Sequence, residues 1–436
     1  MNNNIKKIVK ELYPFDYSVA SEDSDRSIEI YKKYLNFKIH RFKTGQQLNE
    51  WKIPKSIKVK KAQVICEGKI IFDLNKKNLS VISQCKNINI TVNYNTLIKN
   101  IFYSEVVDDA IPYGWVGLYN QKLDWGLCIS KNSLKRLNKK KKYKVIIETE
   151  YKKNSMNVLE YTIKGKSEKT ILINAHNCHP FQANDDISGC SVGISIFQEL
   201  RKRNNLNYSY TLLIAPEMYG PMFWLKRNNP KIIGSILLKS VGNENIMKLQ
   251  KSFRANTMLD KVFSNLIQKK KKNVIGNFRE LHGNDETVFE APGYSIPSIT
   301  LTRMPFKEYH TNKDTPKLIS EKKLQETKNI VLDGIQILDK NYALKNLKKG
   351  LVCLSSKKYN LYIPPKQPGI IKTNKITEKN IKWNLFMNTL SLNIEKGFSV
   401  ADLYLKFGFD HKEIMEYLLQ WKNKKLISFN LKKDLL

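Results

Sequence analysis

Cysteine is scarce in this chain, and long apolar runs are missing. The 436 residues contain 6 cysteines, with no two of them three positions apart, which excludes a dense disulfide framework and favours reduced thiols in a cytoplasmic protein. No stretch reaches the roughly 18 apolar residues that a membrane-spanning helix requires. The first residues carry charges every few positions and have no apolar segment typical of a secretory signal. We therefore expect a cytoplasmic protein with no membrane partner.

Acidic residues are also few compared with basic ones. The chain has 40 Asp and Glu against 75 Lys and Arg, which gives a net charge of +35. Such a charge would ordinarily favour nucleic acid or an anionic surface as a partner. The excess is mainly lysine spread along the whole chain, and the denser runs at 139–142 and 269–272 are typical of solvated loops or helix ends. Because arginine, the usual reader of bases, is scarce, we do not expect a nucleic-acid partner.

The length and the changing periodicity indicate several domains. Residues 1–50 begin with amphipathic helical patterns, and residues 51–149 contain short β-branched runs of period two, as in a small β-rich domain. Residues 150–345 alternate strand and helix patterns, which predicts an α/β fold with an open, mostly parallel sheet. Residues 346–436 contain three short helical patterns and a terminal strand, an order that suggests a winged helix.

The most informative segment, residues 170–189, is an apolar strand pattern followed by a polar loop. Open α/β sheets bind ligands just beyond the carboxyl ends of their strands. This loop holds His176, His179, Asp185 and Asp186, and imidazole and carboxylate are the ligand types of a zinc site. The segment alone is equally compatible with a turn at His179 and an aspartate that caps the next helix.

Two further polar loops, at 216–220 and 307–314, follow later parts of the α/β pattern. A catalytic zinc ion takes three protein ligands and keeps one position open, and a His, an Asp and a His from separate loops would meet that count. Glu217 follows a buried strand pattern and is the candidate for the general base acting on metal-bound water. The alternative is a carboxylate at a helix start, where the helix dipole favours it.

These loops resemble those of a known family, the zinc aminopeptidase-like proteins often found with polysaccharide-biosynthesis genes. The resemblance lies in residues 176–189, 216–220 and 308–314, and it extends through 43–45, 51–54, 110–113 and 125–128. It therefore covers nearly the whole chain. It implies a discontinuous catalytic domain formed by residues 1–50 and 150–345, an inserted β-rich domain at 51–149 and a C-terminal winged-helix domain at 346–436.

The broader family of co-catalytic zinc aminopeptidases also implies roles for single residues. By that resemblance His176, Asp185 and His310 are the metal ligands, and Glu217 is the general base. His179 lies three residues after His176, so the loop could present either ring to the metal. His176 is favoured by its position, and His179 is then expected to support the ligands or to contact a substrate oxygen. Further residues expected beside the site, either lining it or serving the structure, are Asp186, Asp285, Glu286 and Tyr309.

Two positions depart from the family pattern, and they determine the expected metal count. A ligand glutamate of the family falls on Met218, and a ligand aspartate falls near Lys239 or Ser240. Two zinc ions a few ångströms apart need such carboxylates to offset their mutual repulsion. We therefore predict one zinc ion.

The predicted function is hydrolysis of an amide bond, either by an aminopeptidase or by a deacylase of N-acyl amino sugars in surface-polysaccharide biosynthesis. The expected substrate is thus a small molecule, a peptide or an amino-sugar amide. The alternatives are a nucleic-acid-binding regulator that uses the winged helix and an inactive scaffold. Glu413 and Glu416 lie near the start of the presumed recognition helix and would repel phosphates, so homo-oligomer contacts through this module or the inserted domain fit better.

Overall fold

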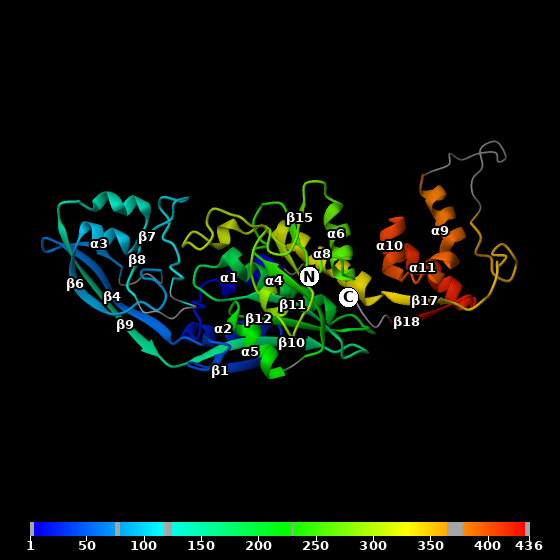
Figure 1. The fold of residues 1–436 in the computed structure, drawn as a ribbon, viewed down its shortest axis with the longest axis horizontal. Coiled ribbons are helices and arrows are strands. Elements are labelled where there is room, and N and C mark those ends of the chain that lie inside the picture. The colour runs from blue at the N-terminus through cyan, green and yellow to red at the C-terminus, as the bar shows by residue number, and fades with distance from the viewer. Residues whose placement is uncertain are drawn as a thin grey trace. The chain divides into compact units, whose positions relative to one another are not determined.

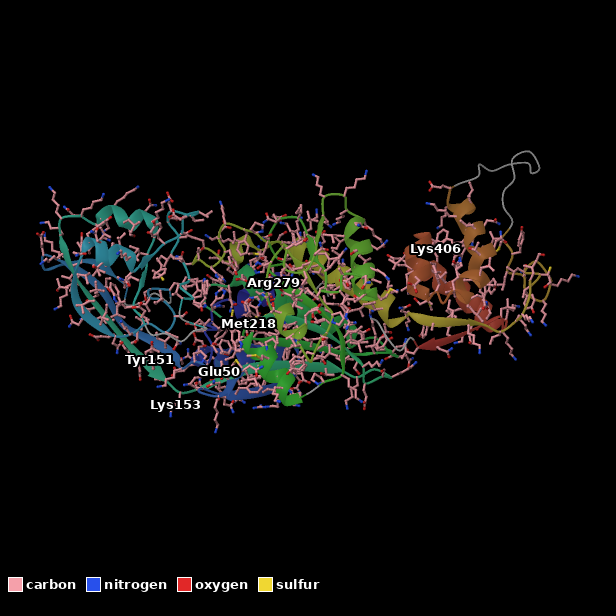
Figure 2. All side chains as sticks on the ribbon, viewed as in Figure 1. Glu50, Tyr151, Lys153, Met218, Arg279 and Lys406 are labelled. Carbon is pink, nitrogen blue, oxygen red and sulfur yellow. The ribbon has the colours of Figure 1, made fainter. Side chains whose placement is uncertain are left out.

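The computed structural model describes residues 4–74, 79–116, 118, 124–228, 230–363 and 378–431. The chain forms two compact units (Figure 1). One consists of Met1–Ala255 and Lys270–Val331, and the other of Asn256–Lys269 and Leu332–Leu436. Among the described residues, no helix combines the length and the apolar character that crossing a membrane would need. Nitrogen-tipped side chains project around the outline of both units, so the positive charge is widely spread (Figure 2).

The first unit is built on an eight-stranded sheet. Its strands, in spatial order, are β1 (Lys38–Lys43), β10 (Ser155–Ile163), β12 (Ser209–Ala215), β11 (Thr170–His176), β13 (Ile232–Lys239), β16 (Ser298–Thr302), β14 (Lys248–Gln250) and β15 (Val274–Gly276). The four consecutive strands from β12 to β16 pair in parallel, whereas β1 and β10 form an antiparallel edge. The predicted α/β class with a mostly parallel sheet is confirmed.

Burial on both faces explains why the sequences of the central strands are continuous apolar runs. Every residue of β11 and of β12 is buried, as expected for parallel strands covered on both faces. The helices of this part are α1 (Ile5–Leu12), α2 (Glu22–Tyr34), α4 (Ser188–Leu200), α5 (Tyr219–Asn228), α7 (Glu286–Phe289) and the first part of α8 (Glu321–Asp339). Short 3-10 helices lie at Lys131–Arg136 and Pro316–Leu318, and a π-helical turn at Ala183–Ile187 precedes α4.

A smaller, antiparallel sheet is formed by the part of the chain between β1 and β10. Its strands, in spatial order, are β5 (Lys69–Asp73), β4 (Ser56–Cys66), β9 (Lys142–Lys152) and β6 (Ile88–Asn93). Around it lie β2 (Gln47–Leu48), β3 (Trp51–Lys52), α3 (Tyr94–Lys99), β7 (Ile101–Phe102) and β8 (Leu127–Cys128). A separate apolar core that includes Val64, Leu127 and Val145 stabilises this β-rich part.

The second unit contains the C-terminal helices. Its elements are α6 (Met258–Gln268), the end of α8, β17 (Tyr342–Asn346), α9 (Glu378–Glu395), α10 (Val400–Phe407), α11 (His411–Asn423) and β18 (Ile427–Leu431). A capping box between Ser399 and Asp402 begins α10, and Gly408 ends it at a φ of 68°. The predicted three helices and terminal strand are present, and β18 pairs antiparallel with β17. The winged-helix assignment stays a prediction.

Candidate metal centre

The carboxyl ends of the parallel strands place the candidate residues at one edge of the sheet. His176 is the last residue of β11, Lys239 is the last residue of β13, and Glu217 follows β12 after one proline. His310 lies in the loop after β16. Because parallel strands end on the same side, these residues meet although they are far apart in the sequence.

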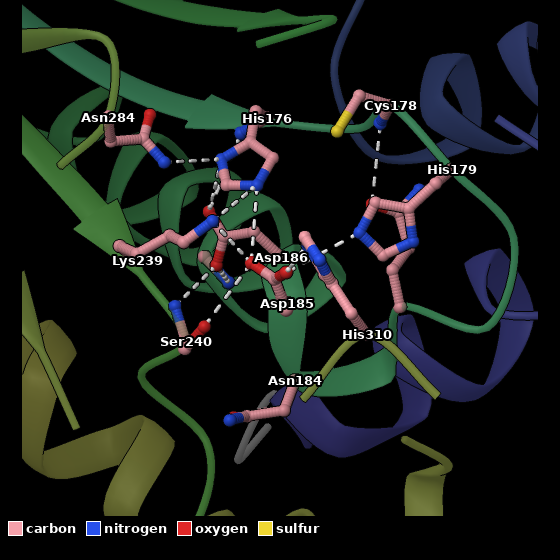
Figure 3. Close-up of polar contacts among 12 residues, drawn as sticks. His176, Cys178, His179, Asn184, Asp185, Asp186, Lys239, Ser240, Asn284 and His310 are labelled. Atoms are coloured by element: carbon pink, nitrogen blue, oxygen red, sulfur yellow. Dashed lines mark hydrogen bonds and ion pairs between the residues drawn. The ribbon is translucent and has the colours of Figure 1, made fainter. Parts of the chain in front are cut away.

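Asp185 is the centre of the cluster. Its side chain is fully buried in the π-helical turn that precedes α4 (Figure 3). The backbone N–H groups of Asn184 and Asp185 donate to the two carboxylate oxygens of Asp314, at 2.7 and 3.0 Å. Asp314 therefore holds the turn that presents Asp185, and burial raises the pKa of the Asp314 carboxyl well above its usual range.

One oxygen of Asp185 faces a lysine. The Nζ atom of Lys239 lies 2.6 Å from Oδ1 of Asp185 and 3.0 Å from Nε2 of His176. Nε2 of His176 also lies 3.3 Å from Oδ1 of Asp185, and its Nδ1 lies 3.4 Å from the amide nitrogen of Asn284. His176 thus lies next to Asp185, as predicted, and the ammonium of Lys239 lies against the ring nitrogen that faces this carboxylate.

The other oxygen of Asp185 faces two further histidines. Nε2 of His179 lies 3.4 Å and Nε2 of His310 lies 3.3 Å from Oδ2 of Asp185. The ligand atoms of these three residues all lie within 4.8 Å of one another. In Figure 3, Lys239 and His310 approach Asp185 from opposite sides.

The hydrogen bonding of His179 tests whether a metal ion fits between these groups. Its Nδ1 lies 2.9 Å from the carbonyl oxygen of Pro180, which can only accept, so Nδ1 carries a proton. Nε2 faces the carboxylate of Asp185 at 3.4 Å, where the two groups together can bind a cation. A backbone carbonyl on the other ring nitrogen is also a common support of a metal-binding histidine. The residues fit a zinc ion.

Two tyrosines hold the imidazole rings. The ring of Tyr113 stacks on His179 at a centroid distance of 4.7 Å, and the ring of Tyr309 stacks on His310 at 3.8 Å. The N–H of Tyr113 also donates to the carbonyl oxygen of His310 at 2.7 Å. Tyr113 belongs to the β-rich segment 51–149, so this segment contributes directly to the centre. Tyr309 was predicted either to donate to an oxyanion or to pack, and the structure shows the packing contact.

Glu217 lies at the border of the cluster. With His176 and Cys178 it forms a second group of side chains that could hold a metal ion, since one ligand atom of each residue lies within 4.8 Å of the others. Burial raises the pKa of Glu217, but the positive charge of Lys239 outweighs this and holds the pKa below its usual range. Glu217 is therefore ionised at neutral pH, as a general base must be.

The loop after Glu217 is fixed by Asp285. The carboxylate of Asp285 accepts from the N–H of Met218 at 2.6 Å and from the side chain of Asn174 at 2.7 Å. Burial raises the pKa of Asp285 to about 7. Glu286, also fully buried, accepts from the N–H of Asn284 at 2.9 Å. Both acids thus serve the backbone next to the centre.

Charge within the cluster is strongly coupled. Burial alone would raise the pKa of the Asp185 carboxyl, but Lys239 holds it well below its usual range. Burial alone would lower the pKa of Lys239, yet Asp185 raises it well above its usual range. Asp186 differs from Asp185, because its Oδ1 accepts from the N–H groups of Gly189 and Ser240 at 3.0 and 2.9 Å. Burial raises its pKa well above the usual range.

Comparison with known proteins identifies the family. Residues 6–341 match the family described as Domain of unknown function (DUF4910). The chain belongs to the DUF4910 family. A Clostridium acetobutylicum protein, provisionally named a polysaccharide biosynthesis protein with an aminopeptidase-like domain, is 27% identical over 350 residues, which are 79% of this chain and 79% of that protein.

Solved structures show that this DUF4910 chain has an aminopeptidase-like fold. A crystal structure provisionally named a peptidase of C. acetobutylicum matches with a TM-score of 0.77 and 24% identity, over 98% of this chain and 96% of that one. The zinc aminopeptidase BSAP of Bacillus subtilis matches with a TM-score of 0.59 and 15% identity, over 76% and 93%. An aminopeptidase of Aneurinibacillus matches with a TM-score of 0.54 and 14% identity, over 77% and 93%. The predicted resemblance to zinc aminopeptidase-like proteins is confirmed.

Sequence reasoning missed three contributors to the DUF4910 centre. Lys239 was noted only as a departure from the family pattern, although its position at the end of a buried strand places it in the cluster. Asp314 closes the predicted polar loop 307–314, and Tyr113 lies in segment 110–113, which contributed to the family resemblance. The contacts of all three depend on tertiary structure, so no local pattern identifies them.

Proposed function

We propose that this chain is a zinc-dependent hydrolase of an amide bond that binds one ion through His179, Asp185 and His310. The observation that supports it is the grouping of these three residues, in which Nε2 of His179 and Nε2 of His310 lie 3.4 and 3.3 Å from Oδ2 of Asp185. The set differs from the sequence-based prediction in one member, since His179 replaces His176. The reason is the ammonium of Lys239, which lies 3.0 Å from Nε2 of His176 and so occupies the side of Asp185 that His176 faces.

In the proposed reaction, the zinc ion and the side chains of the protein have separate roles. A zinc ion at these ligands supplies Lewis acidity for a carbonyl oxygen and makes water easier to deprotonate. Glu217 accepts the proton of the attacking water and returns it to the leaving amine. Lys239 keeps Asp185 ionised and oriented, and the tyrosines that stack on His179 and His310 keep the two rings in place.

Lys239 also explains why we propose a single ion. Its ammonium lies 2.6 Å from Oδ1 of Asp185 and 3.0 Å from Nε2 of His176, which are the atoms that a second cation on that side would need as ligands. A second divalent ion at that position would meet the fixed positive charge at contact distance. One ion is therefore expected per chain.

Zinc content tests the ligand set. We expect the dialysed wild-type protein to hold one zinc ion by elemental analysis, and His179→Ala and His310→Ala to lose it. His176→Ala is the matched control, since it removes a neighbouring imidazole and should keep the ion. If His176→Ala loses zinc while His179→Ala retains it, the proposed ligand set is wrong. If the wild type holds no more zinc than the His179→Ala and His310→Ala variants, the enzyme proposal itself fails.

Hydrolysis is tested with a panel of aminoacyl amides and N-acylated amino sugars. The sugar amides are included because the C. acetobutylicum relative is named for polysaccharide biosynthesis. We expect Glu217→Gln to keep its zinc and to lose at least about a hundredfold in turnover, as is typical of a lost general base. Equal rates for Glu217→Gln and the wild type would exclude Glu217 as the base.

We further infer that the C-terminal helices serve protein contacts rather than nucleic acid. The start of α11 carries Asp410 as its N-cap and Glu413 in its first turn, so it presents negative charge where phosphates would lie. Fluorescence anisotropy with a labelled DNA duplex tests this. Steeply salt-dependent binding that Lys422→Ala in α11 weakens would contradict the inference.

A further inference from the structure

Lys239 places an ammonium group inside the candidate centre. Its side chain is 1% exposed, and its Nζ lies 2.6 Å from Asp185 and 5.7 Å from the centre of the Tyr309 ring. With the proposed zinc ion on the other side of Asp185, two cations would flank one carboxylate. Any substrate group next to the reacting carbonyl must be compatible with that positive field.

The carboxylates of the cluster are already engaged. Asp185 faces Lys239, and Asp186 accepts from the N–H groups of Gly189 and Ser240. Asp314 accepts from the backbone of the π-helical turn, and Asp285 accepts from Met218 and Asn174. Glu286 accepts from the N–H of Asn284 and lies 3.6 Å from the guanidinium of Arg279. Glu217 is reserved for proton transfer in the proposed reaction. A free ammonium on the substrate would therefore bring a charge that these acids do not neutralise.

An apolar pocket lies beside the residue that follows Glu217. It has a volume of about 600 Å³, and Met218 forms part of its wall. Its other apolar lining residues include Leu48, Trp51, Met222, Val288 and Tyr294. A pocket of this size and character takes an apolar side chain or acyl group.

From these observations we propose that the substrate is an amide whose acyl part is apolar and carries no free ammonium next to the scissile carbonyl. Lys239 is the residue that sets this specificity, because its charge repels an ammonium at that place. The pocket beside Met218 receives the apolar group. This inference rests on the proposed zinc hydrolase function and deepens it, since it excludes ordinary aminopeptidase substrates.

Two hydroxamates test the proposal without knowledge of the natural substrate. L-leucine hydroxamate and N-acetyl-L-leucine hydroxamate share a zinc-binding group and an apolar side chain, and they differ in the free ammonium. We expect calorimetry on the zinc-loaded wild type near neutral pH to show at least about tenfold tighter binding of the acetylated probe, as one close like-charge contact would cause. N-acetylglycine hydroxamate, which has no side chain, should bind more weakly than its leucine counterpart.

Variants of Lys239 test whether its charge causes the preference for the acetylated probe. Lys239→Arg keeps the charge and should keep this preference, whereas Lys239→Met should reduce the difference in affinity between the two leucine hydroxamates. Tighter binding of the ammonium probe to the wild type would overturn the proposal even if Lys239→Met does not fold. Failure of the underlying function looks different, since a protein that holds no zinc should bind neither hydroxamate.

Discussion

The ammonium of Lys239 lies 2.6 Å from Oδ1 of Asp185, and both side chains are almost completely excluded from solvent. A buried charge without a partner is costly, so each of these residues depends on the other for its ionised state. The pair leaves Oδ2 of Asp185 to face His179 and His310. This one contact thus determines which side of Asp185 remains for a metal ion.

Removing the charge of Lys239 should destabilise the metal-free protein. Lys239→Met keeps most of the side-chain volume but leaves Asp185 without its partner, so we expect a loss of about 3–5 kcal/mol in the free energy of unfolding. Urea denaturation in the presence of a chelator measures it. Lys202→Met, which breaks an exposed pair with Glu199, is the control and should change stability by less than about 1 kcal/mol. A similar loss in both variants would mean that the buried pair has no special role.

Zinc should stabilise the first unit by mass action. A ligand that binds only the folded state adds about 3 kcal/mol when its free concentration is a hundred times its dissociation constant. We expect the unfolding temperature to rise when zinc is added to chelator-treated protein. Glu217→Gln should show the same rise, because Glu217 is not among the proposed ligands. No rise with the wild type would contradict a built zinc site.

Asp314 should control the position of Asp185 through the backbone. Asp314→Ala removes both acceptors of the N–H groups of Asn184 and Asp185, which should weaken zinc binding by about 10- to 100-fold, as is typical of groups that support metal ligands. Competition with a chromophoric chelator measures the zinc affinity. Asp314→Asn keeps one acceptor oxygen and should show a smaller loss. Unchanged zinc affinity in Asp314→Ala would show that Asp314 does not support zinc binding.

Gly189 should tolerate no side chain. A Cβ atom at this position would collide with the carboxylate of Asp186, which accepts from the N–H of Gly189 itself. We expect Gly189→Ala to destabilise the fold by about 1–3 kcal/mol, the usual cost of overpacking. Gly193→Ala in the same helix is the matched control, because its Cβ would meet the end of the flexible Leu212 side chain at 2.7 Å. A larger loss of stability in Gly193→Ala than in Gly189→Ala would contradict the predicted collision with Asp186.

His411 should make the second unit sensitive to acid. Burial lowers its pKa from 6.5 to about 4, so the folded state binds the proton less readily than the unfolded state. The stability that depends on the neutral ring is fully present above about pH 6.5 and falls between pH 6.5 and 4, by at most about 3 kcal/mol. Hydrogen exchange of the amides in α11 as a function of pH measures it.

His411→Phe is the test variant for this effect. Within the described part of the chain neither ring nitrogen of His411 has a hydrogen-bond partner, so a phenyl ring sacrifices no such bond. The variant should lose the part of the pH dependence that arises between pH 6.5 and 4. An identical pH profile in the variant and the wild type would exclude His411 as the cause.

The sequence predicted the elements more successfully than the contacts. The apolar strand before His176 and the three helices within 346–436 were predicted correctly, because periodicity and capping are local properties. The residues His176, His179, Asp185, Glu217 and His310 were recognised as candidates because they lie in polar loops after strand patterns and because these loops resemble those of the aminopeptidase family. The sequence did not show which of these residues contact one another in the folded chain. His179 and His176 are three residues apart, and a loop can present either ring.

By itself the sequence determined the α/β architecture, the polar loops at the strand ends and the membership of a family with an aminopeptidase-like fold. Only the tertiary structure decided that Lys239 lies against Asp185 and His176, and that His179 and His310 lie on the other side. The physical reason is that hydrogen-bond partners are set by the packing of β11, β13 and the loop after β16, which are separate in the chain. In the sequence, Lys239 only replaces a ligand aspartate of the family. In the assembled sheet, its ammonium contacts the carboxylate of Asp185.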